Sequence, residues 1–496
     1  MAAQERDSAR IYIIGAGFAG RAIAREIAAK RVFGSVVAFL DDDGTKIGSK
    51  IEGIPVLGPI RDVVNLLSRQ PADEAIIAIP SASREALREL YYLLKKAGFA
   101  RIRIVPTIAQ IIEGDAHLIQ AREIDPQDLL GRNPVTIGIR ESLLYLRGKR
   151  VLITGAGGSI GSELARQLLS AGVARLYLYG HGENSIYNID RDLRLLQEEG
   201  VGEKTAIVPV IGELKDADYV RFIIARLKCD AIFHAAAYKH VPMMEANTVA
   251  AVENNVLGTR NLVEAALSAG VRRFVLISTD KAVEPVSTYG ASKLIAERIV
   301  LDAALRASSG REFMVVRFGN VLGSRGSIVP LFQKQIAKGG PVTITHPDAA
   351  RYFMTIPEAC SLVLKTGGVG RGGNLYLLDM GESVKIRDLA EQMIRFYGFE
   401  PGRDIRIEYI GLRPGERIEE RLWSPEESLV PTEYPRINRL ERTTPPFALE
   451  ELLAEIDPVI RRVHGKESIY RNRHSMRAIL KKHVPTLIVP EHEPEF

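Results

Sequence analysis

The sequence predicts an α/β protein built from two doubly wound domains, the second of which carries an appended lobe. Three observations lead to this fold class. A short apolar strand, a glycine-rich turn and a helical stretch follow one another twice, around residues 11–30 and again around residues 151–172. After each of them, apolar runs alternate with helical patterns, which is typical of a parallel sheet covered by helices. One apolar run, residues 274–277, is followed by a dense group of polar side chains.

The composition is that of a globular protein with two or three domains. The chain has 496 residues, of which 46% are hydrophobic and 26% charged. The net charge of +5 is small for this length and argues against a dedicated nucleic-acid-binding protein. The two cysteines, Cys229 and Cys360, imply no disulfide framework and suit a reducing compartment. No apolar run approaches the roughly 20 residues that span a bilayer, and no signal peptide is evident. We therefore expect a cytoplasmic protein, and no metal site is predicted.

Residues 1–106 are expected to form a first Rossmann-like domain of the type that binds nucleotides or coenzyme A. Gly15, Gly17 and Gly20 stand between an apolar strand and a helical stretch, and glycines there let the backbone approach a phosphate. The next strand ends at Asp41, whose carboxylate could accept a ribose hydroxyl. No set of acid, base or nucleophile accompanies these residues. A nucleotide-type site is one interpretation, and a fold kept for structure or regulation is the other.

A connector rich in charges, residues 107–147, precedes a second Rossmann-like domain at residues 148–432. That domain opens with an apolar strand, a turn with four glycines and a helix. Because a long α/β series follows the turn, it predicts a dinucleotide-binding site. The residues assigned to this turn are Gly155, Gly157, Gly158, Ser159, Ile160 and Gly161.

The choice between NAD and NADP stays open. A carboxylate at the end of the second strand of such a fold favours NAD. Here that strand, residues 175–179, ends in Gly180, and no arginine replaces the acid to hold a 2′-phosphate. Glu183 is the nearest candidate acceptor, and Glu213 follows the next strand.

Small and polar residues follow the strand at residues 231–234. Lys239 and His240 project where a substrate could lie. Asn255, in the next helical stretch, could hold a water molecule or a backbone kink, or could cap a turn, and we also count it among the cofactor residues. The small residues that permit close approach to a cofactor are Ala235, Ala236 and Ala237.

The polar group that follows residues 274–277 is the centre of the prediction. Thr279, Asp280 and Lys281 stand at the carboxyl end of a strand, where open α/β sheets bind ligands. Tyr289 and Lys293 are four residues apart at the start of a helical pattern, so they lie on one face and near the cofactor. A neighbouring ammonium lowers the pKa of a phenol, so Tyr289 with Lys293 could take a proton from an alcohol while a nicotinamide takes the hydride. Asp280 and Lys281 add a second acid–base pair.

Residues 433–496 form a basic C-terminal extension. A solvated helix face is the preferred interpretation, and peripheral contact with an anionic membrane, at its inner face, is the alternative. The cations concerned are Arg461, Arg462, Lys466, Arg471, Arg473, Arg477, Lys481 and Lys482.

Together these motifs resemble the extended short-chain dehydrogenase/reductase superfamily, and more narrowly the nucleotide-sugar 4,6-dehydratases of polysaccharide biosynthesis. The resemblance covers roughly residues 10–430. The segments that carry it are GAGGSIGSELARQLL, HAAAYKHVPMMEAN, NNVLGT, STDKAV, YGASK, RFGNVLGSRGSIVPLF, ARYFMTI and GLRPGER, and the N-terminal GAGFAG and FLDDD match the large members.

The resemblance implies a tightly held NAD or NADP and a UDP-N-acetylhexosamine substrate, with UDP-N-acetylglucosamine as first choice. Tyr289 with Lys293 would start oxidation at C4, whose oxygen Thr279 would hydrogen-bond. Lys281, a lysine tuned by desolvation, would remove the C5 proton, and Asp280 would protonate the departing C6 hydroxyl before hydride returns to C6. The residues assigned to the UDP-sugar are Lys239, His240, Asn320, Arg325, Arg351, Arg413 and Glu416.

Large members of that family usually carry N-terminal transmembrane helices, which this sequence lacks, so we expect either a natural soluble form or a trimmed one. Several large members have methionine where this chain has Tyr289, and the tyrosine is similar to the C5-inverting members, so the C5 configuration stays open. A homo-oligomer is expected by analogy.

Two rival functions differ in what they require. A UDP-hexose 4-epimerase would use Tyr289 and Lys293 but has no need of a pair such as Asp280 and Lys281. A non-catalytic nucleotide-sensing protein would be expected to have lost the tyrosine or the lysine, and both are present.

Overall fold

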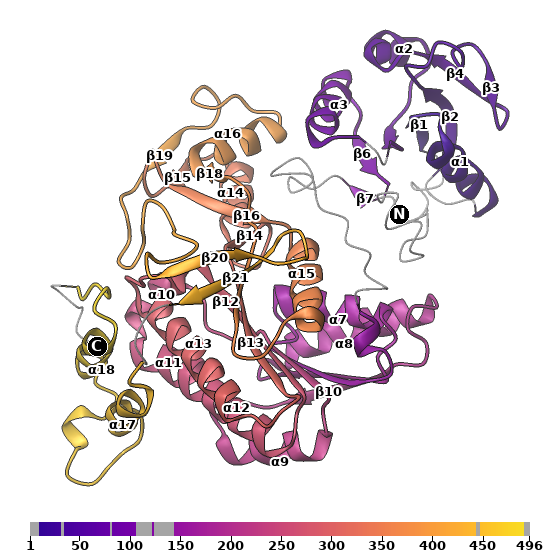
Figure 1. Cartoon of the computed structure of the whole chain (residues 1–496). Helices are drawn as coiled ribbons and strands as arrows, with labels where there is room; N and C mark the ends of the chain where they lie inside the picture. The colour runs from indigo at the N-terminus through magenta and orange to yellow at the C-terminus, as the bar shows by residue number, and fades with distance from the viewer. Residues whose placement is uncertain are drawn as a thin grey trace. The chain divides into compact units, whose positions relative to one another are not determined.

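The computed structural model describes residues 9–30, 34–79, 82–105, 122–123, 143–442 and 447–490 (Figure 1). The chain divides into two compact units, residues 1–136 with 391–404, and residues 137–390 with 405–496. Residues 391–404 thus group with the first unit, whereas the sequence prediction included them in the domain at 148–432. Most of the predicted connector 107–147 lies outside the described residues.

The first unit is built on a seven-stranded sheet in the order β3-β4-β2-β1-β5-β6-β7. Its central strands are parallel and almost wholly buried, as expected for a sheet covered on both faces. Helix α1 packs on one face and helices α2 and α3 pack on the other. The elements are β1 (Arg10–Ile14), α1 (Phe18–Lys30), β2 (Ser35–Leu40), β3 (Lys50–Ile51), β4 (Ile54–Gly58), η2 (Ile60–Asp62), α2 (Val63–Arg69), β5 (Glu74–Ile77), α3 (Arg84–Ala97), β6 (Arg101–Ile104) and β7 (Arg122–Glu123).

The second unit is built on a nine-stranded sheet in the order β10-β9-β8-β11-β12-β13-β17-β21-β20. The strands from β10 to β17 are parallel, and β21 and β20 close the sheet in antiparallel pairing. The strand order reverses between β8 and β11, and ligands bind at the carboxyl ends of strands beside such a reversal. The strands are β8 (Arg150–Thr154), β9 (Arg175–Gly180), β10 (Ala206–Ile211), β11 (Ala231–His234), β12 (Arg273–Thr279), β13 (Glu312–Phe318), β17 (Leu375–Leu378), β20 (Glu427–Pro431) and β21 (Ile437–Arg442).

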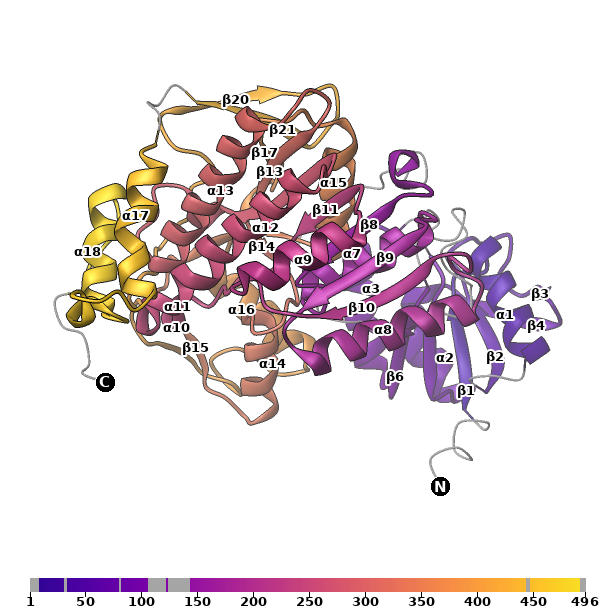
Figure 2. The same ribbon diagram turned by 90° about the horizontal axis from the view of Figure 1, so that it is seen from below.

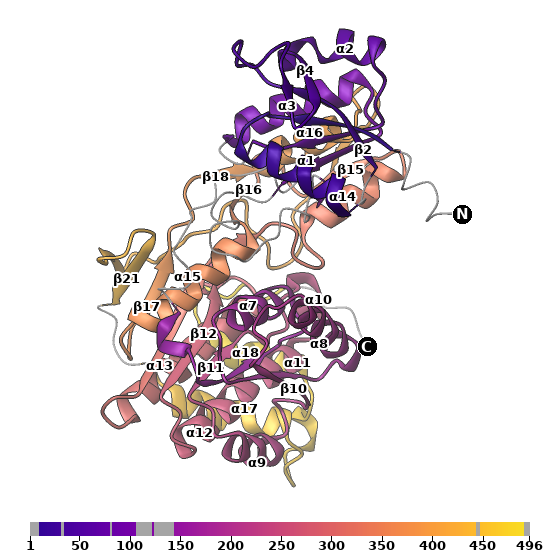
Figure 3. The same ribbon diagram turned by 90° about the vertical axis from the view of Figure 1, so that its right-hand side faces the viewer.

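Helices cover both faces of this sheet (Figure 3). Helices α7, α8 and α15 share one hydrophobic core with it, and α9, α11, α12 and α13 share the other. The helical elements are η3 (Leu144–Leu146), α7 (Ser159–Ser170), α8 (Glu183–Glu198), α9 (Ala217–Leu227), α10 (Val241–Ala246), α11 (Thr248–Val252), η4 (Glu253–Leu257), α12 (Gly258–Ser268), η5 (Asp280–Ala282), α13 (Thr288–Arg306) and α15 (Ile356–Val369). The predicted fold class, two doubly wound α/β domains, is confirmed.

Small sheets and helices form the appended lobe. Strand β14 pairs with β16 and β16 with β18, while β15 pairs with β19. The elements are β14 (Asn320–Val321), α14 (Ile328–Ala337), β15 (Val342–Ile344), β16 (Ala350–Met354), β18 (Ser383–Lys385) and β19 (Ile407–Tyr409). Helix α16 (Ile386–Phe396) begins in this lobe, and its residues from 391 on group with the first unit.

The C-terminal extension is part of the second unit's core. Helices α17 (Leu449–Ile460) and α18 (Arg473–His483), separated by η6 (Glu467–Ile469), lie beside α11 and α13 (Figure 2). Their apolar faces, including Leu452, Ile456 and Met476, are buried in the same core as α12 and α13. The interpretation of the basic residues as a solvated face is wrong for Arg477, whose side chain is only 3% exposed.

Among the described helices, none is both long enough and apolar enough to cross a bilayer.

Candidate active site

The glycine-rich turn after β8 brings three backbone segments together. Gly155 has a φ of +67°, and a Cβ there would lie 2.7 Å from the backbone nitrogen of Ala236. A Cβ at Gly157 would lie 2.6 Å from the Cβ of Ser185, and one at Gly161 would lie 2.2 Å from the carbonyl oxygen of Gly155. Larger residues cannot fit here without moving the backbone, so the turn packs tightly against the loop after β11 and the start of α8.

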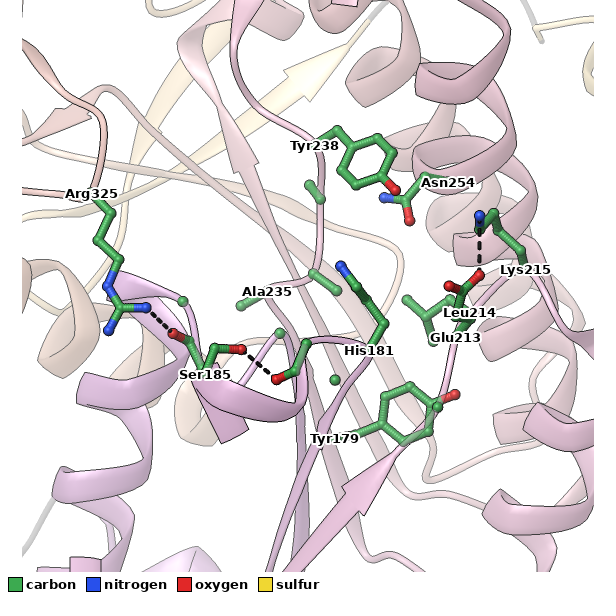
Figure 4. Close-up of a pocket in the computed structure, with 18 of the residues that line it drawn as sticks. Tyr179, His181, Ser185, Glu213, Leu214, Lys215, Ala235, Tyr238, Asn254 and Arg325 are labelled. Atoms are coloured by element: carbon green, nitrogen blue, oxygen red, sulfur yellow. Dashed lines mark hydrogen bonds and ion pairs between the residues drawn. The ribbon is translucent and has the colours of Figure 1, made fainter. Parts of the chain in front are cut away.

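A cavity of about 530 Å³ opens beside this turn (Figure 4). The predicted cofactor residues that line it are Gly155, Gly157, Gly158, Glu213, Ala235, Ala236 and Ala237, and two predicted substrate residues, His240 and Arg325, line it as well. The lining residues that the sequence analysis did not select are Tyr179, Gly180, His181, Gly182, Ser185, Gly212, Leu214, Lys215, Tyr238 and Asn254.

The end of the cavity beside α7 suits an anion. The helix begins after Gly158, which supplies no capping side chain, and its first turn, which contains Ser159 and Ile160, has no acidic residue. The first N–H groups and the helix dipole are therefore available to a phosphate. Arg325 brings a positive charge to this end of the cavity. Its guanidinium is held against the turn because Nη1 donates to the Gly157 carbonyl at 3.0 Å.

Of the two acidic residues predicted to bind the ribose of the cofactor, only Glu213 lines the cavity. Glu213 lines the cavity and pairs with Lys215 at 3.0 Å (Figure 4). Glu183, the first residue of α8, is exposed and is not among the residues that line the cavity. At position 180 a Cβ would lie 3.0 Å from Ile186, so a larger side chain there would be crowded. The choice between NAD and NADP therefore stays open.

Asn255 braces the wall of the cavity. Its Oδ1 accepts from the Tyr238 N–H at 2.9 Å, and its Nδ2 donates to the Tyr238 carbonyl at 3.0 Å and to Ser292 Oγ at 3.0 Å. Asn255 lies in the π-helical turn η4 and is 2% exposed, whereas its neighbour Asn254 lines the cavity. Asn255 thus links the loop after β11 to α13 and is not among the residues that line the cavity.

The predicted catalytic residues gather where β12 ends. Because β11 and β12 pair in parallel, the cavity's alanine loop and this strand end lie at the same edge of the sheet. Thr279 Oγ1 donates to Asp280 Oδ1 at 3.0 Å, and Lys281 Nζ donates to the same oxygen at 2.9 Å. Asp280 is fully buried, and its Oδ2 has no hydrogen-bond partner in the part of the chain that the structure describes.

Helix α13 brings Tyr289 beside this group. Ser287 caps the helix, accepting from the Gly290 N–H at 3.0 Å. A Cβ at Gly290 would lie 2.2 Å from the Lys281 carbonyl oxygen, so glycine lets the helix begin directly against η5. The Tyr289 hydroxyl is buried within hydrogen-bonding reach of Thr279.

The pKa shifts of Tyr289 and Lys293 differ from the expected ones. Burial raises the pKa of Tyr289 to about 12, although the Lys281 ammonium and the hydrogen bond with Thr279 oppose this. Lys293 Nζ donates to the Ile277 carbonyl at 2.8 Å, and burial lowers its pKa to about 8. The expectation that Lys293 lowers the pKa of Tyr289 is therefore wrong here, because burial dominates and Lys281 is the ammonium that acts on the phenol.

Lys281 lies between two carboxylates. Its Nζ is 2.9 Å from Asp280 Oδ1 and 3.7 Å from Glu420 Oε1, and it donates to Asn320 Oδ1 at 3.0 Å. Burial lowers the pKa of Lys281, but the charges of Asp280 and Glu420 outweigh burial and raise it above its ordinary value. The resemblance had implied that desolvation lowers the pKa of Lys281 and makes it a base. In this structure the two carboxylates outweigh desolvation, so desolvation alone does not have that effect.

The other predicted substrate residues differ in position, and only Asn320 directly contacts the predicted acid–base pair, at Lys281. Arg413 pairs with Glu416 at 2.7 Å near the surface. The Arg351 guanidinium donates to the carbonyls of residues 417 and 418 at 2.7 Å, so it braces the loop that carries them. Lys239 Nζ donates to Ser324 Oγ at 3.5 Å.

In the first unit, Asp41 is engaged within the protein. Its Oδ2 accepts from the Ala16 N–H at 2.7 Å, and Lys46 Nζ lies 3.2 Å from both carboxylate oxygens. Gly15 has a φ of +101°, and a Cβ at Gly20 would lie 2.0 Å from the Gly15 carbonyl oxygen. At Gly17 a Cβ would meet no atom within 4 Å, so the turn does not need glycine there. Asp41 therefore holds the glycine turn, and its assignment to the ribose of a nucleotide stays a prediction.

Glu420 is the residue of the buried cluster that sequence reasoning missed. It is 9% exposed and lies 3.7 Å from Lys281 and 3.9 Å from Arg351. It follows Glu419 in a run of charged residues, and nothing in that run indicates which glutamate faces inward. Only the three-dimensional position distinguishes them.

The parallel sheet, the glycine turn and the Tyr289–Lys293 helix define a Rossmann-fold protein of the short-chain dehydrogenase/reductase type. Residues 151–442 match the family described as "Polysaccharide biosynthesis protein", and the chain belongs to that family. Residues 6–94 match the family described as "CoA binding domain".

Three curated relatives show how the similarity is distributed. The chain is 42% identical over 432 residues to the probable polysaccharide biosynthesis protein EpsC of Bacillus subtilis, covering 87% of this chain and 71% of that protein. It is 32% identical over 289 residues to an inverting UDP-N-acetylglucosamine 4,6-dehydratase of Campylobacter jejuni, covering 58% and 81%. It is 31% identical over 288 residues to a UDP-glucose 4-epimerase of Rickettsia akari, covering 56% and 79%.

Among solved structures, the X-ray structure of Pen from Bacillus thuringiensis is similar, with 32% sequence identity and a TM-score of 0.53. The match covers 60% of this chain and 89% of that one.

Proposed function

We propose that the chain is a UDP-N-acetylglucosamine 4,6-dehydratase that supplies a 4-keto-6-deoxy sugar nucleotide for polysaccharide or glycoconjugate biosynthesis. The overall reaction oxidises C4, reduces C6 and releases one water, without net redox change. The observation that carries the proposal is the buried Asp280–Lys281 pair, 2.9 Å apart, beside Tyr289. Removal of a C5 proton and departure of a C6 hydroxyl require such an additional base and acid.

A nicotinamide dinucleotide fits the cavity, and when bound it would supply the group that accepts and returns hydride. The first turn of α7 and Arg325 would hold its pyrophosphate, and the tight glycine turn would admit it close to the backbone. Glu213 and Lys215, which line the cavity, would face the ribose of the dinucleotide.

Each proton transfer of the proposed reaction is assigned to a different side chain. Thr279 and Tyr289 would hydrogen-bond the C4 oxygen, and Tyr289 would exchange the C4 hydroxyl proton, assisted by Lys293. Lys281 would take the C5 proton, which the neighbouring C4 ketone makes acidic. Asp280 would donate a proton to the leaving C6 hydroxyl. Asn320, which binds Lys281 at 3.0 Å, would orient the base.

A UDP-hexose 4-epimerase is the second candidate, favoured by the similarity to the Rickettsia akari protein. Epimerisation at C4 leaves the C5–H and C6–OH bonds intact, so it gives the Asp280–Lys281 pair no chemical task.

Incubation of the purified full chain with UDP-N-acetylglucosamine in deuterated water tests the proposal, with NMR and mass spectrometry of the product. A 4-keto-6-deoxy sugar nucleotide with deuterium at C5 is expected, and its coupling constants report whether C5 is retained or inverted. The Lys281→Met variant, prepared in parallel, is expected to form no such product. UDP-N-acetylgalactosamine without solvent deuterium would identify an epimerase, and unchanged substrate would refute the dehydratase assignment.

A further inference from the structure

The loop that joins Lys281 to Tyr289, residues 283–287, has four carbonyls in a row that are bound by donors distant in the sequence. We call it the bridging loop. Its residue Glu284 has a φ of +40°, which side-chain-bearing residues rarely adopt and which persists only where neighbouring structure enforces it. Arg417 donates to the carbonyls of Val283 and Glu284. This side of the loop is therefore held by the segment that also carries Glu420.

The C-terminal extension holds the other side of the bridging loop. Thr486 Oγ1 donates to the Pro285 carbonyl at 2.8 Å, and the Ile488 N–H donates to the Val286 carbonyl at 3.2 Å. Lys481 Nζ donates to the carbonyls of residues 485 and 487 at 2.7 Å, which fixes the turn that presents Thr486. The carbonyls of residues 283–286 are thus all bound by donors distant in sequence, two of them from residues 486–488.

A second connection runs from α18 to the first residue of α13. Arg477 lies 3.4 Å from Glu245 Oε2 and donates to Thr248 Oγ1 at 3.1 Å. Glu245 Oε1 in turn accepts from the Thr288 N–H at 2.6 Å, next to Tyr289. Arg477 and Glu245 are both almost fully buried, so this charge-assisted chain is shielded from water.

We propose that the C-terminal extension positions the catalytic segment, with Arg477 as the central positioning residue. The extension lies beyond residues 151–442, the part that matches the family, yet it binds both the bridging loop and the start of α13 (Figure 2). Arg477 acts through Glu245 and the Thr288 amide to fix the Tyr289 hydroxyl relative to Lys281. The catalytic part of this inference rests on the proposed dehydratase function, and the structural part does not.

The test compares four variants of the full chain. Arg477→Met removes the charge, Arg477→Lys keeps the charge but loses the fork of guanidinium donors, and Thr486→Val removes one hydroxyl at the surface. Lys482→Met is the matched control, because Lys482 lies on the same helix but is exposed and pairs with Glu451, which is exposed, and Glu455, which is half-buried.

Two readouts separate positioning from general stability. In hydrogen–deuterium exchange, Arg477→Met is expected to speed exchange of peptides covering residues 283–290 about tenfold while the β-strand peptides of the same unit keep their protection. In the dehydratase assay, kcat is expected to fall about tenfold with KM nearly unchanged, because a small misplacement of a reacting group has a large effect on rate. Arg477→Lys should recover part of both effects, Thr486→Val should show both more weakly, and Lys482→Met should show neither.

Normal protection of residues 283–290 and normal kcat in Arg477→Met would overturn the inference, as would protection lost equally throughout the unit. If Arg477→Met does not fold, Thr486→Val decides: unchanged exchange at residues 283–290 refutes the role of the extension. If the wild-type chain does not convert UDP-N-acetylglucosamine, the proposed function fails while the exchange experiment still tests the connection.

Discussion

Replacing Arg317 by methionine should reveal how strongly one buried ion network supports the active-site strand. Arg317, at the end of β13, is fully buried and bonds two carboxylates, Glu297 at 2.8 Å and Glu427 at 2.9 Å. Glu297 also accepts from Ser278 Oγ in β12 at 2.6 Å and lies one helical turn after Lys293. The network therefore joins β12, α13 and β20 behind the proposed catalytic residues.

The expected loss of stability follows from the carboxylates that stay buried after Arg317 is replaced. After Arg317→Met, Glu427 keeps Arg442 at 2.6 Å, whereas Glu297 keeps the neutral Ser278 hydroxyl. Removing one partner of a buried pair costs about 3–5 kcal/mol, because the other charge stays buried without compensation. That is a large part of the roughly 5–15 kcal/mol by which a typical domain is stable.

Urea unfolding followed by tryptophan fluorescence measures the stability lost in Arg317→Met. The chain has a single tryptophan, Trp423, next to Leu422, whose carbonyl accepts from Arg317 at 3.4 Å. The signal therefore reports on the second unit. Arg306→Met is the matched control, since Arg306 is about half exposed and pairs with Glu264 at the surface, where such pairs contribute about 0–1 kcal/mol. A loss below about 1 kcal/mol for Arg317→Met would refute the reasoning, since breaking a buried pair costs more than that.

The difference in unfolding free energy between wild type and Arg317→Met should change with pH in one direction. Burial raises the pKa of Glu427, but Arg317 and Arg442 outweigh burial and hold it below its ordinary value. A carboxyl with a lowered folded-state pKa stabilises the protein above its unfolded pKa of about 4.3, and that contribution is lost as the pH falls through the folded pKa. The stability difference between wild type and Arg317→Met should therefore be full at neutral pH and shrink in acid. A difference that is constant down to acid pH would contradict this account.

The remaining predictions concern the site itself. Glu420 raises and Arg351 lowers the pKa of Lys281, so the rising limb of the kcat/KM–pH profile should move to lower pH in Glu420→Gln and to higher pH in Arg351→Gln. Shifts in the same direction would show that neither charge acts through Lys281. In Gly157→Ala the new methyl would lie within 2.7 Å of Ser185, so dinucleotide affinity measured by calorimetry should fall about tenfold or more. Unchanged affinity would mean that the turn does not bind the cofactor.

The parts of the fold that the sequence predicts are those set by local pattern. The strand at residues 231–234 has the predicted bounds, and the glycine turn and the start of α13 fall where Gly155 and Tyr289 placed them. Strands β20 and β21 were not predicted, because β21 takes its place by pairing with β17, more than 40 residues earlier in the chain, and β20 pairs, among the described strands, only with β21. Such pairing leaves no short-range signal in the sequence.

The charge states of the site could not be predicted for a related reason. A tyrosine four residues before a lysine indicates a shared helix face, but not that Lys293 donates to the Ile277 carbonyl or that burial outweighs its charge at Tyr289. Likewise, the basic composition of residues 433–496 does not reveal that Arg477 meets the buried Glu245. Burial and partner identity are properties of the folded chain, and they decide the direction of a pKa shift.

The resting geometry suggests how one proton transfer prepares both proposed groups for elimination. Lys281 as an ammonium cannot take the C5 proton, and Asp280 as a carboxylate cannot protonate the C6 hydroxyl. Moving one proton the 2.9 Å from Lys281 Nζ to Asp280 Oδ1 yields a neutral amine and a carboxylic acid together. Exclusion of water by a bound substrate favours this neutral pair over the ion pair, because separated charges lose solvation. Glu420, 3.7 Å from Lys281, raises the pKa of that lysine and would therefore oppose the transfer.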